Sequence, residues 1–304
     1  MDMVKIFAIV VTYNGMRWYD RCFGSLRNSD MPVETIVIDN ASTDETVSYI
    51  KEHFPEVCII ESKENLGFAK ANNIGIKRAL DNGADYVFLL NQDAWVEKNT
   101  LSKLVQTFDE NENIGIVSPI HLKGDYSGLD IGFTKYMPTD FVSDAYMSCL
   151  KKNYYVTSVN AAAWLIRPEC IRKVGGFDTM LFVHYGEDDN YCQRMKYHGY
   201  KIAVCTKTTI CHDREYRKGD DANDPGRQIF NVKAEILRLK RIFGDINVEV
   251  DINREIRKEK FYMVMSYICF RFSSAHYRSQ NVSTLKQIKI SRMLNKQGGE
   301  IWLD

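Results

Sequence analysis

The first 115 residues alternate short apolar runs with stretches of helical periodicity, and no other feature of the chain constrains the fold as strongly. Ile6–Val11 is a continuous run of apolar, mostly β-branched residues that is too short for a helix, which is typical of a strand covered on both faces. Similar runs predict strands over 35–38, 57–60 and 86–90, and helical spacing predicts helices around 18–26, 68–80 and 101–108. Such repetition predicts an α/β fold, with a mostly parallel central sheet flanked by helices.

The pattern becomes mixed after residue 113. We expect strands over 114–120 and 159–167, a short helix from Pro168 to Gly175, and a further helix over 187–197. Residues 123–158 are rich in Gly, Tyr and Asp, which is typical of a long loop that closes over a ligand.

Beyond residue 224 the sequence predicts helices. One apolar stripe ends at Gly244 and consists of Ile229, Val232, Ile236, Leu239 and Phe243. Residues 251–304 carry ten Lys/Arg against five Asp/Glu. Two interpretations stay open: a solvated helical face, or a basic surface whose aromatic residues contact anionic lipid, namely Phe261, Tyr262, Tyr267, Phe270 and Phe272 beside Arg271.

Composition excludes several classes of protein. Forty basic and forty acidic residues cancel, which argues against binding nucleic acid along the whole surface. The eight cysteines contain no C-x-x-C pair, so we expect reduced thiols in the cytoplasm rather than a zinc ribbon. The apolar run at 261–270 is far shorter than the roughly 20 residues of a membrane span, and the N-terminus has no secretory pattern.

Polar residues follow each of the first four predicted strands. They are Thr12-Tyr13-Asn14, Asp39-Asn40, Asn65-Leu66-Gly67 and Asn91-Gln92-Asp93. The carboxyl ends of parallel strands share one edge of a sheet, where ligands bind in α/β proteins, so the four clusters predict one binding site. Ser42-Thr43-Asp44-Glu45, just after the second cluster, predicts a capping box for a helix.

Three further features carry candidate chemistry, each beside a plainer interpretation. Gly186-Glu187-Asp188-Asp189 opens a helix, where acidic residues serve either as caps or, at the end of a cleft, as a general base. Asp93 after a buried strand either makes an Asx turn or holds Mg²⁺ or Mn²⁺. His212 is either a structural histidine or a metal ligand.

Taken together, these motifs resemble the family-2 glycosyltransferases of the GT-A fold, a Rossmann-like fold that binds nucleotide-diphospho-sugars, and in particular the rhamnosyltransferase-like bacterial members. Order and spacing both match from Ile9 to His212, through Val11-Thr12-Tyr13-Asn14, Ile38–Asp44, Asn65–Ala69, Leu89–Asp93, Val174–Asp178 and Glu187-Asp188 leading to Cys192 and Arg194. The resemblance implies a GT-A domain over 1–220, with a nucleotide-binding half over 1–115 and an acceptor and catalytic half over 116–220. A helical C-terminal extension covers 221–304.

The resemblance also implies roles for individual residues. Asp39 contacts the nucleotide base, and Asp188, beside Glu187, is the catalytic base. Asp93 and His212 hold the metal ion, although Asn91 stands where the family has a first carboxylate. The remaining nucleotide-sugar residues are Thr12, Tyr13, Asn14, Asn65, Gly67, Lys70 and Gln92.

The expected reaction is transfer of a sugar, with inversion, from a UDP-, dTDP- or GDP-linked donor to a hydroxyl of a glycan or lipid-linked saccharide, assisted by Mn²⁺ or Mg²⁺. The acceptor is expected to contact Trp164, Phe177 and Asp178, with core packing as the alternative for Trp164. The enzyme is expected in the cytoplasm, or peripherally at the inner face of the cytoplasmic membrane through its C-terminal helices. Its oligomeric state is left open.

Three rival functions predict other features. An NAD-dependent oxidoreductase needs G-x-G-x-x-G after the first strand, where this chain has Thr12-Tyr13-Asn14-Gly15-Met16. A nucleotidyltransferase needs a glycine-rich basic phosphate loop near the N-terminus. A catalytically inactive carbohydrate-binding protein would not need Glu187, Asp188, Asp93 and His212, all of which are present.

Overall fold

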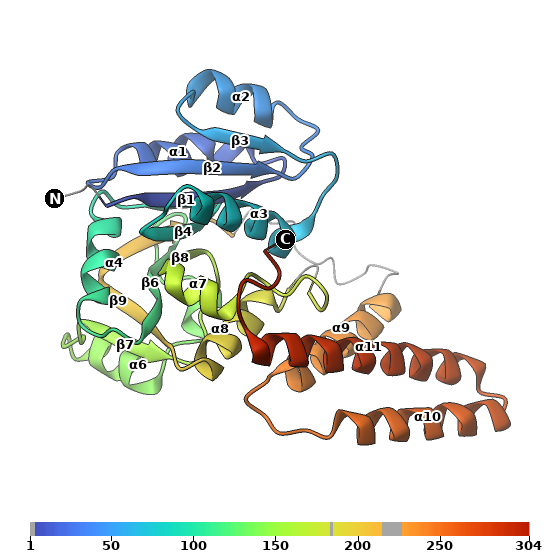
Figure 1. Ribbon diagram of the computed structural model, residues 1–304. Helices are drawn as coiled ribbons and strands as arrows, with labels where there is room; N and C mark the ends of the chain where they lie inside the picture. The colour runs from blue at the N-terminus through green and yellow to red at the C-terminus, as the bar shows by residue number, and fades with distance from the viewer. Residues whose placement is uncertain (1–3, 183–184, 215–226, 304) are drawn as a thin grey trace.

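The computed structural model describes residues 4–182, 185–214 and 227–303, with only the backbone described for 227–233 and 235. Its centre is a nine-stranded sheet in the order β3-β2-β1-β4-β8-β6-β9-β5, with β7 paired to β9 (Figure 1). The strands are β1 (Ile6–Thr12), β2 (Val33–Asp39), β3 (Cys58–Glu61), β4 (Tyr86–Asn91), β5 (Ala94–Val96), β6 (Ile114–Lys123), β7 (Asn153–Val156), β8 (Ala163–Ile166) and β9 (Lys201–His212).

The first half of the sheet is parallel, as the strand–helix repetition predicts. β1 lies between β2 and β4 and pairs in parallel with both, and β2 pairs in parallel with β3. The second half is mixed, because β8 runs antiparallel to β4 and β6 while β6 and β9 are parallel. The α/β class and the sheet flanked by helices are confirmed.

Helices cover both faces of the sheet. They are α1 (Tyr19–Arg27, preceded by a 3₁₀ turn at Met16–Trp18), α2 (Thr46–His53), α3 (Gly67–Asp81), α4 (Thr100–Phe108), α5 (Ile131–Thr134), α6 (Thr139–Tyr146), α7 (Pro168–Val174), α8 (Glu187–Tyr197), α9 (Arg227–Gly244), α10 (Ile252–Ile268) and α11 (Phe272–Gln297). Ile6, Ala8 and Val10 pack in the core on the side of α1, α2 and α4. Phe7 and Ile9 pack on the opposite side with α3, α7 and α8. This two-sided burial explains why β1 has no polar face.

Two expectations for local structure are wrong. Residues 123–158 are not one irregular loop, because they contain α5, α6 and β7. Helices of four and eight residues are too short to show periodicity, which is why the sequence does not reveal them. The capping box also does not form: α2 begins at Thr46, and the Asp44 carboxylate accepts the Thr46 backbone N–H at 3.1 Å.

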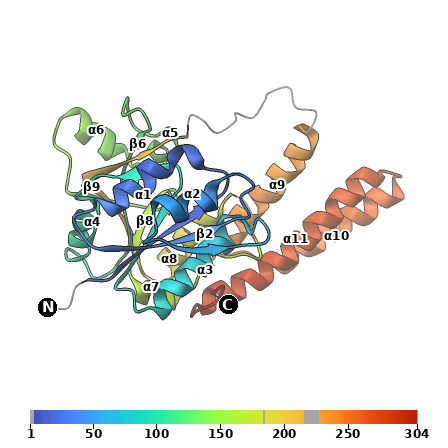
Figure 2. The same cartoon turned by 90° about the horizontal axis from the view of Figure 1, so that it is seen from above.

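α10 and α11 form an antiparallel hairpin that extends away from the sheet (Figures 1 and 2). Its near end is fixed to the body by Asp178, whose carboxylate accepts hydrogen bonds from Ser291 at 2.5 Å and Asn295 at 3.0 Å. The boundary expected between residues 220 and 221 lies outside the described residues, as do the side chains of Ile229 and Val232. In the described part of the chain, no helix is both long enough and apolar enough to cross a membrane.

Candidate active site

The polar clusters after β1 and β2 lie together at one edge of the sheet. The Asn14 side-chain oxygen accepts the Thr43 backbone N–H at 2.9 Å, and the Asn14 backbone N–H donates to Ser42 Oγ at 3.1 Å. Asn14 adopts a positive φ of 47°, a conformation that Asn tolerates better than most residues. The two loops are therefore fixed to one another.

Gln92 joins the cluster after β4 to the one after β1. Its side-chain oxygen accepts the Tyr13 backbone N–H at 2.9 Å, and its amide donates to the Tyr13 carbonyl at 3.2 Å. A Cβ at Gly15 would overlap the Gln92 side-chain oxygen, so this close approach requires glycine. Gln92 thus organises the edge, while the half-exposed Tyr13 ring remains on its surface.

Asp39, at the end of β2, is buried inside this edge. Its carboxylate accepts hydrogen bonds from Thr12 Oγ1 at 3.0 Å, from the Ser42 backbone N–H at 2.9 Å and from Ser42 Oγ at 2.6 Å. An ionised carboxylate has about four acceptor positions, so about one is left for a ligand. Thr12 is fully buried, so it orients Asp39 rather than lining an open pocket.

The cluster after β3 joins the same edge through Asn40. The Asn40 side chain accepts the Leu66 backbone N–H at 3.1 Å and donates to the Gly67 carbonyl at 3.3 Å. Asn65 accepts the Gly67 backbone N–H at 2.9 Å, and Gly67 has a φ of 75° that favours glycine. Lys70 is exposed one turn into α3 and lines a cavity of about 470 Å³ with Lys77 and Trp302, so its contact with a diphosphate stays a prediction.

Asp93 and His212 lie side by side although 119 positions separate them in the chain. β5 pairs with β9 so that Ala94 lies opposite His212, which brings His212 Nε2 to 3.4 Å from Asp93 Oδ1. Asn91 Nδ2 lies 3.3 Å from the same ring nitrogen. Adjacent ligands about 2.1 Å from an octahedral Mg²⁺ or Mn²⁺ lie about 3 Å apart, so the two side chains fit a shared ion.

These two residues supply only part of a coordination shell. Among the residues that the structure describes, no group of three or more His, Cys, Asp or Glu residues is arranged to hold a metal ion. The donor set therefore fits an ion that a diphosphate and water complete, as in phosphate-binding Mg²⁺ sites.

Asp130 is a member of this cluster that the sequence did not single out. Its Oδ2 lies 2.8 Å from His212 Nδ1 and 3.1 Å from Arg214 Nε. Its Oδ1 caps α5 by accepting the Gly132 and Phe133 backbone N–H groups. Burial alone would raise the pKa of Asp130, but the contacts with His212 and Arg214 hold that pKa well below its usual range. The one sequence signal for Asp130 is its position as the N-cap of α5, and that helix lies in a segment expected to be loop.

The acidic run opens α8 behind a glycine that no other residue would replace easily. Gly186 has a φ of 95°, and a Cβ there would lie 2.9 Å from Phe182 Cε1. The backbone reverses at this point and helix α8 begins with Glu187 buried and Asp188 half-buried. Glu187 Oε2 is buried and has no hydrogen-bond partner in the described structure.

The two carboxyl groups have raised pKa values. Burial, and then the neighbouring Asp189 charge, raise the pKa of Asp188 to about 6. Burial, and then Asp188, raise the pKa of Glu187 to about 7. Carboxyl groups with pKa values near 6 to 7 are suited to general acid–base chemistry at neutral pH.

The segment just before β8 connects Asp188 to the binding edge. The Ala161 backbone N–H lies close enough to the Asp188 carboxyl to lower its pKa, partly opposing the effect of burial. The next residue, Ala162, accepts the Asn91 backbone N–H at 3.0 Å. Asp188 is therefore linked through two consecutive residues to the end of β4, beside Asp93 and His212.

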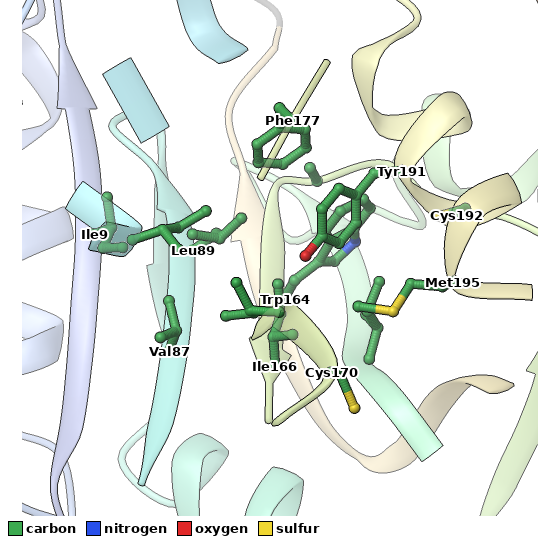
Figure 3. Packing of buried hydrophobic residues seen from close by; sticks show 14 of the residues in the cluster. Ile9, Val87, Leu89, Trp164, Ile166, Cys170, Phe177, Tyr191, Cys192 and Met195 are labelled. Atoms are coloured by element: carbon green, nitrogen blue, oxygen red, sulfur yellow. The ribbon is translucent and has the colours of Figure 1, made fainter. Parts of the chain in front are cut away.

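The expectation that Trp164, Phe177 and Asp178 contact the acceptor is wrong. All three side chains are fully buried. The Trp164 and Phe177 rings stack with centroids 6.2 Å apart, and Phe177 lies 4.8 Å from the Tyr191 ring (Figure 3). Core packing, the alternative interpretation of Trp164, is therefore the right one. Asp178 binds α11 rather than a ligand.

Other polar residues surround the acidic run. Tyr136 lies close to Asp188 and Asp189; burial raises its pKa, and those two charges raise it further. A polar cavity of about 230 Å³ adjoins Asp189, which accepts Ser158 Oγ at 2.8 Å. It is lined by Thr157, Ser158, Asp189, Gln193, Lys196, Arg241, Asp245 and Asn247. Its walls come from three separate segments, so no local motif could have predicted it.

Residues 7–156 match the family model described as glycosyl transferase family 2. The dTDP-rhamnosyl transferase RfbF of Shigella flexneri is 26% identical over 253 residues, which cover 78% of this chain and 80% of that protein. The O-antigen chain rhamnosyltransferase WbaN of Salmonella anatum is 27% identical over 221 residues, covering 70% of this chain and 68% of the relative.

Solved structures show the same architecture. GalNAc-T7 with UDP, GalNAc and Mn²⁺ superposes with a TM-score of 0.60 at 17% identity, over 80% of this chain and 50% of that one. Staphylococcus aureus TarS 1-349 in complex with UDP-GlcNAc superposes with a TM-score of 0.54 at 16% identity, over 82% and 68% of the two chains. At this identity the likeness shows the fold alone.

Fold, motifs and relatives together define an enzyme of the glycosyltransferase class with the GT-A fold. Its domain over residues 7–156 belongs to glycosyl transferase family 2, and the relatives RfbF and WbaN are named as rhamnosyltransferases. The resemblance predicted from the sequence is thus confirmed.

Proposed function

We propose that this enzyme transfers a deoxyhexose from a nucleoside-diphosphate donor to a saccharide hydroxyl, with inversion at the anomeric carbon and Asp188 as the general base. One observation supports this most directly: the half-buried Asp188 carboxyl has a raised pKa and is linked through Ala161 and Ala162 to the edge that carries Asp93 and His212. A base at the start of α8, next to a diphosphate site at the strand ends, is what single-displacement transfer requires.

The transfer is a single displacement at the anomeric carbon. The acceptor oxygen forms a bond to the anomeric carbon while the bond from that carbon to the diphosphate oxygen breaks. The acceptor proton passes to the Asp188 carboxylate, and the bonding pair leaves with the nucleoside diphosphate. Burial and the neighbouring Asp188 charge raise the pKa of Glu187 to about 7, so a larger share of Glu187 than of Asp188 is protonated at neutral pH.

Asp93 and His212 are the residues that would hold a divalent ion, with Asn91 orienting a water molecule. Such an ion, when bound, neutralises charge on the diphosphate that leaves. Asp130 holds the His212 ring from its other nitrogen, 2.8 Å away, so that Nε2 faces Asp93.

Donor binding can be tested by thermal shift with dTDP, UDP and GDP. The name of the relative RfbF favours a dTDP-linked donor, so we expect dTDP with Mn²⁺ to give the largest rise in Tm. A ligand at 100 times its Kd should stabilise the fold by about 2.7 kcal/mol. Asp39→Asn should weaken binding at least about tenfold and reduce that stabilisation by about 1.4 kcal/mol. Equal shifts in the wild type and in Asp39→Asn would remove Asp39 from the base-binding role.

Metal dependence is a separate prediction. Removing divalent ions by dialysis against a chelator should lower transfer by at least about 10²-fold, and Mn²⁺ should restore it, because an ion supplies several kcal/mol of charge stabilisation. Electron paramagnetic resonance should show Mn²⁺ bound in the presence of dTDP, and His212→Ala should release that ion. Transfer that survives the chelator, with no Mn²⁺ signal, would contradict the metal site.

The acceptor is proposed to be a glycan or a lipid-linked saccharide that enters beside Tyr136 and the 230 Å³ cavity. Both lie next to Asp188 and Asp189 and offer hydroxyl, amide and charged groups to sugar hydroxyls. A lipid-linked acceptor would require the enzyme to work at a membrane surface, peripherally and on the cytoplasmic side.

A further inference from the structure

The far end of the α10–α11 hairpin carries an unusual concentration of exposed apolar side chains. We call residues 261–272 the hairpin tip; it is the end of the hairpin that lies farthest from the sheet (Figures 1 and 2). All of its large apolar residues except Met263 are between 40% and 80% exposed: Phe261, Tyr262, Val264, Met265, Tyr267, Ile268, Phe270 and Phe272. Soluble proteins rarely expose a continuous apolar patch of this kind without a binding role.

The apolar stripe of α10 faces away from its partner helix. Phe261, Val264 and Ile268 are spaced i, i+3 and i+7 along one side, and each is more than half exposed. The side that faces α11 is apolar near the body, where Ile256 packs against the buried cluster that contains Leu285 and Ile288. Toward the tip it is polar instead: Glu259 pairs with Arg278 at 2.8 Å, and Ser266 Oγ lies 3.3 Å from Ser274 Oγ. A surface helix ordinarily buries its apolar stripe, so this reversal indicates that another apolar phase covers the tip.

Positive charge surrounds the tip. Residues 254–278 contain six Lys/Arg against two Asp/Glu, and the tip itself contains Arg271 and no acidic residue. Both acidic groups are paired, Glu259 with Arg278 and Glu255 with Lys258, so the segment keeps a net positive charge. Basic residues next to exposed aromatic and aliphatic side chains complement a surface that is anionic outside and apolar below.

We propose that the hairpin tip inserts into the surface of an anionic phospholipid membrane. Phe261 to Ile268 cover about 10 Å along the helix axis, which matches the roughly 5–10 Å depth that interfacial helices reach. The basic residues Arg257, Lys258 and Lys260 lie one turn or less behind this segment, level with the headgroups. This inference concerns a surface outside the catalytic site and does not depend on the sugar-transfer chemistry.

The same charges disfavour a second copy of this chain as the occupant. Packing two tips together would bring like net charges close, the two copies of Arg271 among them. A bilayer with acidic headgroups supplies both the counterions and the apolar interior. The tip is also too short to cross a bilayer, which limits the contact to one leaflet.

Flotation with vesicles tests the proposal. The full chain should float with phosphatidylglycerol–phosphatidylcholine vesicles, less with pure phosphatidylcholine, and less at high salt. The triple variant Phe261→Ser/Val264→Ser/Ile268→Ser should lower the partition coefficient at least tenfold. Ile290→Ser/Met293→Ser is the matched control, because these α11 side chains are also exposed (47% and 63%) but lie outside the tip. The control should float like the wild type.

Two further measurements keep the result interpretable. An environment-sensitive fluorophore on exposed Cys269, in a variant whose exposed Cys58 and Cys149 are Ser, should become brighter and shift to the blue on adding anionic vesicles. Light scattering should show the same molar mass for the wild type and the triple variant, and transfer to a water-soluble acceptor should be unchanged. Equal flotation of the wild type and the triple variant would overturn the proposal. So would a wild-type dimer that is lost in the triple variant.

Discussion

Asp188→Asn is expected to bind the nucleoside diphosphate as the wild type does and to lose sugar transfer by at least about 10²-fold, the lower range for a positioned base. The amide keeps the shape of the side chain but cannot accept the acceptor proton. Steady-state kinetics would show the fall in kcat, and the thermal shift with dTDP would show intact donor binding. Normal turnover by this variant would exclude Asp188 as the base.

The pH dependence of kcat/KM tests the role of Asp188 independently. Because only ionised Asp188 accepts a proton, kcat/KM should fall below about pH 6, where that carboxyl becomes protonated. Asp189→Asn removes the like charge that helps to raise the pKa of Asp188, so this variant should stay active and lose activity only at lower pH. An unmoved acid limb would contradict the coupling.

Replacing Asp188 by Asn should lower activity without lowering the stability of the fold at neutral or higher pH. A carboxyl whose pKa is raised on folding favours the folded state at low pH, and that contribution is lost as the pH rises through the folded-state pKa. Asp188 is such a group, so its ionised form destabilises the fold above about pH 6. Asp188→Asn should therefore have a Tm at pH 8 that is equal to or above that of the wild type. Loss of transfer with a lowered Tm would indicate damage to the fold instead.

Asp178→Ala is expected to lower the free energy of unfolding by at least about 3 kcal/mol, since buried donors left without an acceptor cost about 1–3 kcal/mol each. The fully buried Asp178 carboxylate accepts the Met180 and Leu181 backbone N–H groups, both at 3.0 Å, as well as Ser291 and Asn295 on α11. The loss would therefore loosen the attachment of the helical hairpin. Denaturant unfolding and Tm measure it.

A matched carboxylate separates this effect from the simple loss of charge. Asp251→Ala removes an exposed N-cap of α10, which should cost about 1 kcal/mol. Ser291→Ala removes a single donor to Asp178 and should give an intermediate loss. If Asp178→Ala were no more destabilising than Asp251→Ala, Asp178 would not be the attachment point that the structure indicates.

The parallel half of the sheet and its polar edge could be predicted because they depend on local patterns. Short β-branched runs fix strands such as β1, and parallel pairing then brings their carboxyl ends together whatever the loops contain. This is why Asn14, Gln92 and Asp93 could be placed near one another from the sequence. Their individual ligands remain proposals.

The remainder depends on contacts between distant segments, which periodicity does not encode. Asp130 reaches His212 only because a short α5 forms inside a segment that resembles a loop. Trp164 resembles a sugar platform in sequence, yet β8 places it in the middle of the core beside Phe177. Aromatic residues suit both settings, so only the three-dimensional neighbours distinguish them.

Asn73 has a consequence for the order in which the nascent chain matures. Its amide donates to the Phe177 carbonyl at 2.9 Å and to the Trp302 carbonyl at 2.7 Å, and its oxygen accepts the Phe177 N–H at 2.7 Å. A side chain synthesised in the first quarter of translation therefore lacks one acceptor until residue 302 has left the ribosome. This hydrogen bond between α3 and the C-terminal segment must therefore be one of the last to form in the biogenesis of the protein.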